Sequence, residues 1–150
     1  NESGWGQMIN QAGGHNVIES DMQVEDSDYA DAEAVINSNP DVVIKTVYRD
    51  QKDGIMADNY LPPEEADYTF AKEEMKSREG FSKMKAIEDD NIIMCSDFCL
   101  RGGGNTVGLA FFAKWLHPDL FEDFDAYEIF DQWMTEFQNM DAIEGHVYEE

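Results

Sequence analysis

Residues 30–47, ADAEAVINSNPDVVIKTV, decide the fold class of this chain. Asp31 or a neighbour is placed to cap a helix whose apolar residues recur at helical spacing. Asn39-Pro40 ends that helix, because the residue before a proline avoids the helical conformation. The run 41–47 is β-branched and apolar almost throughout, which is typical of a strand buried on both faces. A helix, a turn and a buried strand in this order predict an αβ unit of a parallel sheet.

The segments after this unit continue the alternation of helix and strand. Polar residues 48–68 predict a long loop. Residues 69–90 predict a helix interrupted at Gly80, and NIIMCS, residues 91–96, predicts a second buried strand. Two helices follow, a strongly apolar one over residues 106–116 and an amphipathic one over residues 126–140.

The segments before the unit predict a helix over residues 5–12, ended by the glycine pair at 13–14, and a candidate strand over residues 16–20. An acidic, exposed loop is expected over residues 21–30. The whole order predicts the α/β class, as one domain over residues 1–150: a three-layer αβα Rossmann-like lobe with a mostly parallel central sheet. Because a helix comes almost at once, we expect this sheet to lack its first strand, which would lie upstream in a longer protein.

Charge restricts the possible partners. The chain of 150 residues has 33 acidic and 10 basic side chains, for a formal net charge of -23. A field of that sign repels phosphates, so nucleic acid is not expected as a partner. The acidity fits a solvated surface in a salty or extracellular setting, or the recruitment of a cationic ligand or metal ion. No apolar run reaches the 18–20 residues or so of a membrane span.

The two cysteines, Cys95 and Cys99, allow three interpretations: free thiols, a local disulfide, or part of a metal site. A zinc site needs two further ligands, and the three histidines are scattered along the chain. Cys99 with His117 could be read as a nucleophile and its base, but a histidine before a proline at a helix end is typical of a capping residue. We therefore expect no metal site and no catalytic residues.

A glycine-rich segment, RGGGNTVG at residues 101–108, precedes the helix over residues 106–116. Its glycines miss the spacing of a dinucleotide fingerprint by one residue, and no lysine follows as in a phosphate-binding loop. A flexible turn capped by Asn105 or Thr106 explains these glycines. Arg101 stands out, because it follows a buried strand at the edge where open α/β sheets bind their ligands.

Four segments, GWGQMINQAGGHNVI, DAEAVINSNPDVVI, FSKMKAIEDDNIIMC and GLAFFAKWLHPDLF, together resemble a known family in their order and separation. They resemble the C-terminal lobe of the periplasmic (class III) substrate-binding proteins of ABC importers for iron-siderophore, haem or cobalamin. This resemblance implies two α/β lobes with the ligand held between them, of which this chain supplies the second.

The resemblance also implies roles for particular residues. Arg101 matches an arginine that contacts an anionic ligand, and its planar fork of donors suits carboxylate or catecholate oxygens. Glu33 matches a glutamate that docks onto basic residues of the permease, although a solvated residue at a helix N-terminus explains it equally simply. The other candidates to line the ligand cleft are Trp5, Tyr48, Arg49 and Phe98, with a core role for Trp5 as the alternative.

The expected function is therefore a non-enzymatic, extracytoplasmic binding lobe without a cofactor of its own, whose ligand is a metal chelate. Its expected partners are that chelate, an ABC permease and the N-terminal lobe of the parent chain. A membrane anchor is expected elsewhere in the parent protein. Two alternatives stay open: a structural or interaction domain with a vestigial cleft, and a nucleotide-binding oxidoreductase fragment.

Overall fold

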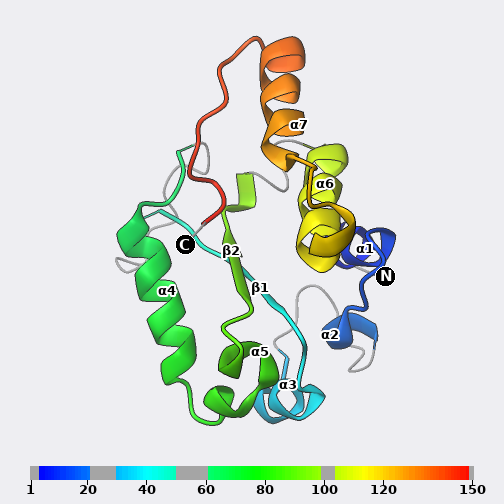
Figure 1. Cartoon of the computed structure of the whole chain (residues 1–150). Coiled ribbons are helices and arrows are strands. Elements are labelled where there is room, and N and C mark those ends of the chain that lie inside the picture. Colours follow the sequence, from blue (N-terminus) through cyan, green and yellow to red (C-terminus); the bar gives the residue numbers. More distant parts are fainter. Residues whose placement is uncertain (1–3, 21–29, 50–60, 99–103, 149–150) are drawn as a thin grey trace.

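The computed structural model of the chain describes residues 4–20, 30–49, 61–98 and 104–148 (Figure 1). Its α-helices are α1 (Gly4–Gln11), α2 (Val17–Ser20), α3 (Ala32–Ser38), α4 (Glu65–Ser77), α5 (Lys85–Glu88), α6 (Gly104–Leu116) and α7 (Ala126–Gln132). Its strands are β1 (Val43–Thr46) and β2 (Ile92–Cys95). Two 3₁₀ helices, η2 (Phe81–Lys83) and η4 (Pro118–Leu120), and a π-helix, η5 (Trp133–Gln138), complete these elements.

The sheet is parallel, as the sequence predicts for strands joined through a helix. β1 pairs with β2 in a register that sets Val43 beside Ile92 and Thr46 beside Cys95. On the other side of β2, the end of the chain adds an antiparallel bridge between Cys95 and Val147. The strand order and its crossover through α4 give an α/β lobe.

Alternate residues of the strands face opposite layers of helices. Val43 and Val47 pack into clusters with side chains of α4, α5 and η2. Ile44 and Cys95 instead belong to a cluster with side chains of α1, α6 and α7. In Figure 1, α4 lies on one side of the strands and α6 with α1 on the other. The predicted three-layer αβα architecture is confirmed.

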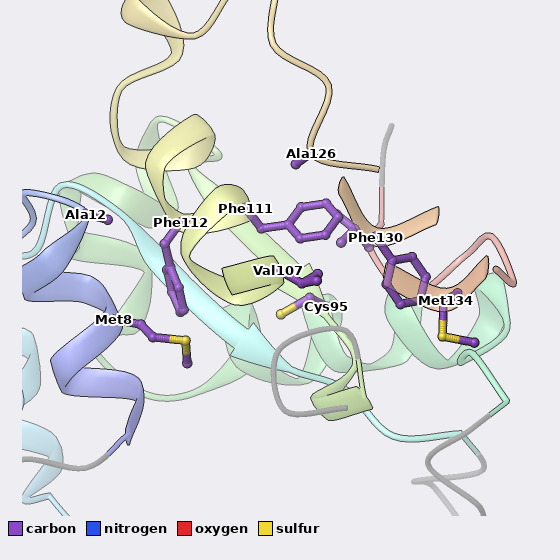
Figure 2. Packing of buried hydrophobic residues seen from close by; sticks show 10 residues of the cluster. Met8, Ala12, Cys95, Val107, Phe111, Phe112, Ala126, Phe130 and Met134 are labelled. Carbon is purple, nitrogen blue, oxygen red and sulfur yellow. The ribbon is translucent and has the colours of Figure 1, made fainter. Parts of the chain in front are cut away.

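The larger cluster is rich in aromatic rings (Figure 2). Phe111 and Phe112 of α6 and Phe130 of α7 are almost fully buried. Burying a side chain of this size contributes about 1.5–3 kcal/mol relative to leaving it exposed. These rings hold α6 and α7 on the sheet.

Several predicted helix ends are confirmed, each with its physical cause. The Asp31 carboxylate accepts a hydrogen bond from the backbone N–H of Ala34 (3.0 Å), so it is the N-cap of α3. Gly13, just after α1, has a φ of 82°, and Gly80, between α4 and η2, has the same value. Glycine adopts this left-handed conformation without a steric penalty, which explains both interruptions.

Three predictions need correction. The candidate strand over residues 16–20 is wrong: α2 is helical, and its start is favoured by Asn16, whose Oδ1 accepts from the N–H of Ile18 (3.2 Å). The last helix does not stay α-helical, because it continues from residue 133 as a π-helix. β1 is only half-buried along its whole length, whereas its apolar sequence predicts a strand covered on both faces. Residues 21–29 of the expected acidic loop and 50–60 of the long loop lie outside the described residues.

Candidate functional site

The carboxyl ends of β1 and β2 lie at the same edge of the sheet, because the strands are parallel. Tyr48 and Arg49 follow β1 there, and Ser96, Asp97 and Phe98 follow β2. Open α/β sheets bind their ligands beyond this edge. This edge of the sheet is therefore the candidate site. Arg101 and Cys99, which follow in the chain, lie outside the described residues.

Arg49 is tied to the start of α4. Its Nη1 donates to the carbonyl of Pro62 (3.2 Å), and its Nη2 forms an ion pair with the carboxylate of Glu64. Glu64 is the N-cap residue of α4. The guanidinium thus fixes the entrance of this helix, and its charge is already balanced by a carboxylate. Tyr48 beside it is half-buried.

Trp5 and Phe98 are half-buried side chains that pack against the aromatic cluster. The ring of Trp5 meets Phe112 edge to face, with 6.0 Å between centroids. Phe98 meets Phe130 in the same way at 6.2 Å, and it lies over the ring of His146 at 4.9 Å. These contacts give Trp5 the core role that the sequence left as its alternative, and they give Phe98 a comparable one. Each ring also keeps an exposed part.

A buried polar pair, Ser96 and His146, joins the end of β2 to the end of the chain. Ser96 Oγ lies 2.6 Å from His146 Nδ1, and the N–H of Ser96 donates to the carbonyl of His146 (2.6 Å). Both residues are buried, so the pair is out of reach of a substrate and serves to position the C-terminal segment. Asp97, next to it, is also buried. Sequence analysis missed this pair. Its one sequence signal is that polar residues follow directly after the buried strand β2.

His117 also proves to be a positioning residue. Its Nε2 lies 2.9 Å from the carbonyl oxygen of Ala12, just after α1. An imidazole N–H at this point satisfies one of the carbonyls that a helix leaves unpaired at its end. The sequence predicts a capping residue here, and the structure shows that the capped helix is α1.

A hollow of about 950 Å³ opens between the N-terminus of α4, the start of α7 and the segment 142–148. Tyr68 and Tyr148 stack in its wall, with 5.0 Å between ring centroids, and the Tyr68 hydroxyl donates to the carbonyl of Gly145 (2.8 Å). No lysine or arginine is among the described residues that line this hollow. Its acidic lining residues are Glu65, Asp125, Glu128, Asp131 and Glu144.

Glu33 lies in the first turn of α3 and is exposed. The fixed N-cap at Asp31 holds this turn, so the carboxylate is presented from a defined helix end. This position leaves Glu33 accessible to a partner protein.

Metal-ligand clusters and membrane-spanning helices are two further features that bear on function. The part of the chain described above contains no group of three or more His, Cys, Asp or Glu side chains able to hold a metal ion. Cys95 is fully buried, and the disulfide and metal interpretations of its pairing with Cys99 stay predictions. Every helix within the described ranges is too short or too polar to cross a membrane.

The first 97 residues, which include α1, β1, α4 and β2, match the family model described as periplasmic binding protein. The chain belongs to the periplasmic binding protein family. The match covers the αβ unit at residues 30–47 and ends just after β2, at the candidate edge.

A solved structure shows the same fold. The chain is similar to the TroA-like periplasmic binding protein FepB from Veillonella parvula, with a TM-score of 0.78 and 19% sequence identity. The likeness covers 97% of this chain and 42% of that protein, so the chain spans less than half of this structural relative. No curated protein matches the chain.

Proposed function

We propose that this chain is the C-terminal lobe of an extracytoplasmic binding protein that captures an iron-siderophore, haem or cobalamin-type chelate and delivers it to an ABC importer. The observation that carries the proposal is the periplasmic binding protein match over residues 1–97, on a lobe that covers 42% of a longer relative of the same fold. A second lobe would complete the protein and the cleft. The proposed activity is binding and release, without catalysis.

The proposed site is the carboxyl edge of the sheet, with Tyr48, after β1, and Arg101, which follows β2 in the sequence, as the proposed contacts. Arg101 would supply the donor fork for an anionic chelate. Arg49 would act indirectly in this scheme, by holding the loop after β1 against Pro62 and Glu64. Trp5 and Phe98 would offer only their exposed parts to the ligand.

Calorimetric titration with ferric siderophores, haemin and cobalamin tests the proposal on this chain and on the longer parent protein. We expect measurable binding by the parent and weak or undetectable binding by the isolated lobe, which has half of the site. Arg101→Ala in the parent should weaken an anionic chelate by about 1.5–3 kcal/mol, the contribution of a hydrogen bond to a charged group. Arg78→Ala is the matched control, because Arg78 is exposed and paired with Glu74 at the far end of α4. A parent protein that binds none of these chelates would refute the proposal.

Glu33 is the proposed docking residue for the permease. An exposed carboxylate on a helix end can pair with a basic residue of a partner at modest energetic gain. Glu33→Ala should reduce uptake by cells while leaving chelate affinity unchanged, and Glu88→Ala, another exposed helix-end glutamate, should change neither. Equal uptake by both variants would remove this role.

A second candidate function, an interaction domain with a vestigial cleft, rests on a specific observation. Arg49 is neutralised by Glu64, and both Trp5 and Phe98 pack against the core instead of standing clear of it. Under this hypothesis Arg101→Ala would lower the free energy of unfolding and leave chelate binding unchanged. The same titration and a denaturation curve therefore separate the two functions.

A further inference from the structure

The proposed chelate site leaves the hollow of about 950 Å³ without a role. This hollow lies on the outer side of β2, where the C-terminal segment, red in Figure 1, descends between α4 and α7. Its floor is apolar and aromatic, and it is built from α4, α7 and the segment itself: Tyr68, Tyr127, Ile143, Val147 and Tyr148. Concave surfaces with tyrosine rings are typical contact sites for a partner.

The floor of the hollow is held in place by contacts within the protein. Tyr68 is almost fully buried, and its hydroxyl donates to the carbonyl of Gly145 (2.8 Å). Its ring stacks on that of Tyr148, with 5.0 Å between centroids. A surface that is already ordered loses little conformational entropy on binding, which favours its use as a binding surface.

The outer backbone edge of the C-terminal segment is already occupied at Val147. The two neighbours of Val147 bond to β2, His146 through its carbonyl and Tyr148 through its N–H. Successive residues of a strand direct their backbone groups to opposite edges, so those of Val147 point away from β2. The Tyr127 hydroxyl accepts from the Val147 N–H (3.1 Å) and donates to the Val147 carbonyl (3.4 Å). An occupant of the hollow therefore cannot add a strand at Val147, and side chains must provide the contacts.

The rim of the hollow is acidic. Five exposed carboxylates surround the floor: Glu65, Asp125, Glu128, Asp131 and Glu144. The ion pairs among the described residues use other carboxylates: Asp41, Glu64, Glu74 and Asp90. The rim thus keeps a negative field that complements an occupant with several positive charges.

The floor and the rim together indicate the kind of occupant. The described residues contain no group of three or more acidic, histidine or cysteine side chains able to hold a metal ion, so the rim does not select a metal. A small hydrophilic cation would use the rim and leave the apolar floor uncovered. A segment that carries both basic and apolar side chains uses both parts of the hollow.

We propose that this hollow docks a basic segment of a partner protein, in which arginine or lysine residues alternate with apolar ones. The basic groups pair with the rim carboxylates and lie against the electron-rich faces of the tyrosine rings. The apolar side chains cover the half-buried Ile143 and Tyr148. An apolar centre within a charged rim is the usual anatomy of a protein interface. This role goes beyond chelate binding and does not depend on it.

Fluorescence anisotropy with labelled synthetic peptides tests the proposal on the full-length protein. The probe is an octapeptide of alternating arginine and leucine, and the comparison peptide has the same charge with glycine in place of leucine. The arginine–leucine peptide should bind about 10-fold more tightly, because its leucines cover the floor. Both affinities should fall as salt is added, because exposed charges are screened.

Two charge-matched double variants separate the hollow from general attraction to an acidic protein. Glu128→Gln with Asp131→Asn removes two rim charges and should weaken binding of the arginine–leucine peptide about 10-fold. Asp119→Asn with Glu122→Gln removes two charges outside the lining of the hollow and should leave the affinity nearly unchanged. All four carboxylates are exposed, so both variants should fold, and a Tm measurement checks this.

The variant Ile143→Ala tests the floor, because it should weaken the arginine–leucine peptide and leave the arginine–glycine peptide unaffected. Equal weakening by the two double variants would overturn the proposal in favour of unspecific attraction. Equal affinity for both peptides, or for spermine, would overturn it in favour of a small-cation site, and no binding of either peptide would remove the docking role. Chelate titration is a separate measurement, so either proposal can fail while the other stands.

Discussion

The two faces of the sheet are packed by different kinds of side chain. On the face of α1, α6 and α7, rings of Phe111, Phe112 and Phe130 meet edge to face with neighbouring aromatic side chains. On the face of α4, the fully or nearly fully buried side chains include Met75, Met84 and Met94. Rings fill space rigidly, whereas methionine has a flexible chain that adapts to gaps. The first face should therefore tolerate substitution less than the second.

The α4 face also carries most of the described ion pairs. Asp90 accepts from Lys72 (3.0 Å) and from Lys76, and these hydrogen bonds hold the pKa of its carboxyl below the usual value. Burial lowers the pKa of Lys45 on β1, and the nearby charge of Arg78 lowers it further. The difference between the faces teaches that the aromatic packing on α6 and α7 does not depend on charge, while α4 also depends on ion pairs that salt and acid can weaken.

The largest effect is expected for Phe112→Ala. Phe112 has no exposed surface, and its removal leaves a cavity among rings that cannot collapse, so the free energy of unfolding should fall by about 3–5 kcal/mol. Urea denaturation measures this loss. Phe137→Ala is the control, because Phe137 is 71% exposed and its loss should cost less than about 0.5 kcal/mol. Similar losses for both variants would contradict the central place of the aromatic cluster.

Met84→Ala should cost less, about 2–3 kcal/mol, because the flexible neighbour Met75 can partly fill the space. Met84→Leu conserves volume and should cost less than about 1.5 kcal/mol. Measuring Phe112→Leu in the same denaturation experiment sharpens the comparison, because it shows how much stability a leucine costs on each face. If the alanine variants at both positions lost equal stability, the faces would not differ in adaptability.

Added salt should stabilise the whole protein. The formal charge of -23 repels itself across a small surface, and 0.1 M salt screens such repulsion beyond about 10 Å. Each kcal/mol of relieved repulsion raises Tm by about 2–4 °C in a domain of this size, and this gain outweighs the screening of the few ion pairs on the α4 face. Calorimetry from low salt to molar KCl measures the change. A flat or falling Tm would show that self-repulsion has no consequence for stability.

The smallest effect concerns Asp90 and pH. Its pKa is lower in the folded than in the unfolded state, so its contribution is present above the unfolded value and is lost as the pH falls through the folded value. Because the Asp90 carboxylate is exposed, the contribution should be below about 1 kcal/mol. Asp90→Asn should reduce the loss of stability on acidification, measured by denaturation at pH 7 and at pH 3. An unchanged pH dependence would assign the acid sensitivity to other carboxylates.

The fold followed from the sequence wherever local chemistry determines the structure. The sequence predicted the cap at Asp31, the glycine stops and both strands, because each of them depends on residues nearby in the chain. The α-helix at residues 17–20 was missed, because four residues are too few to distinguish a helical period from an extended one.

Features made by distant parts of the chain could not be predicted. Ser96 and His146 are 50 residues apart, and the antiparallel pairing of Val147 gives no periodic signal. The ion pair of Arg49 with Glu64 likewise needs the structure, and it gives this candidate ligand contact a role in holding the start of α4. The family resemblance supplied the candidate residues, but only the packing showed which of them have exposed surface left.

The pairing of Val147 with Cys95 also sets how many neighbours one molecule can recruit through its sheet. An unpaired strand edge is a template for intermolecular β-pairing. Because the C-terminal segment occupies the outer edge of β2, the described sheet has one unpaired edge, that of β1. Pairing between copies through this edge would therefore stop at a dimer. Removal of residues 142–150 by a protease would expose the second edge and make each molecule bivalent, which permits linear polymers. Light scattering of the intact and the trimmed chain should distinguish a dimer limit from open-ended growth.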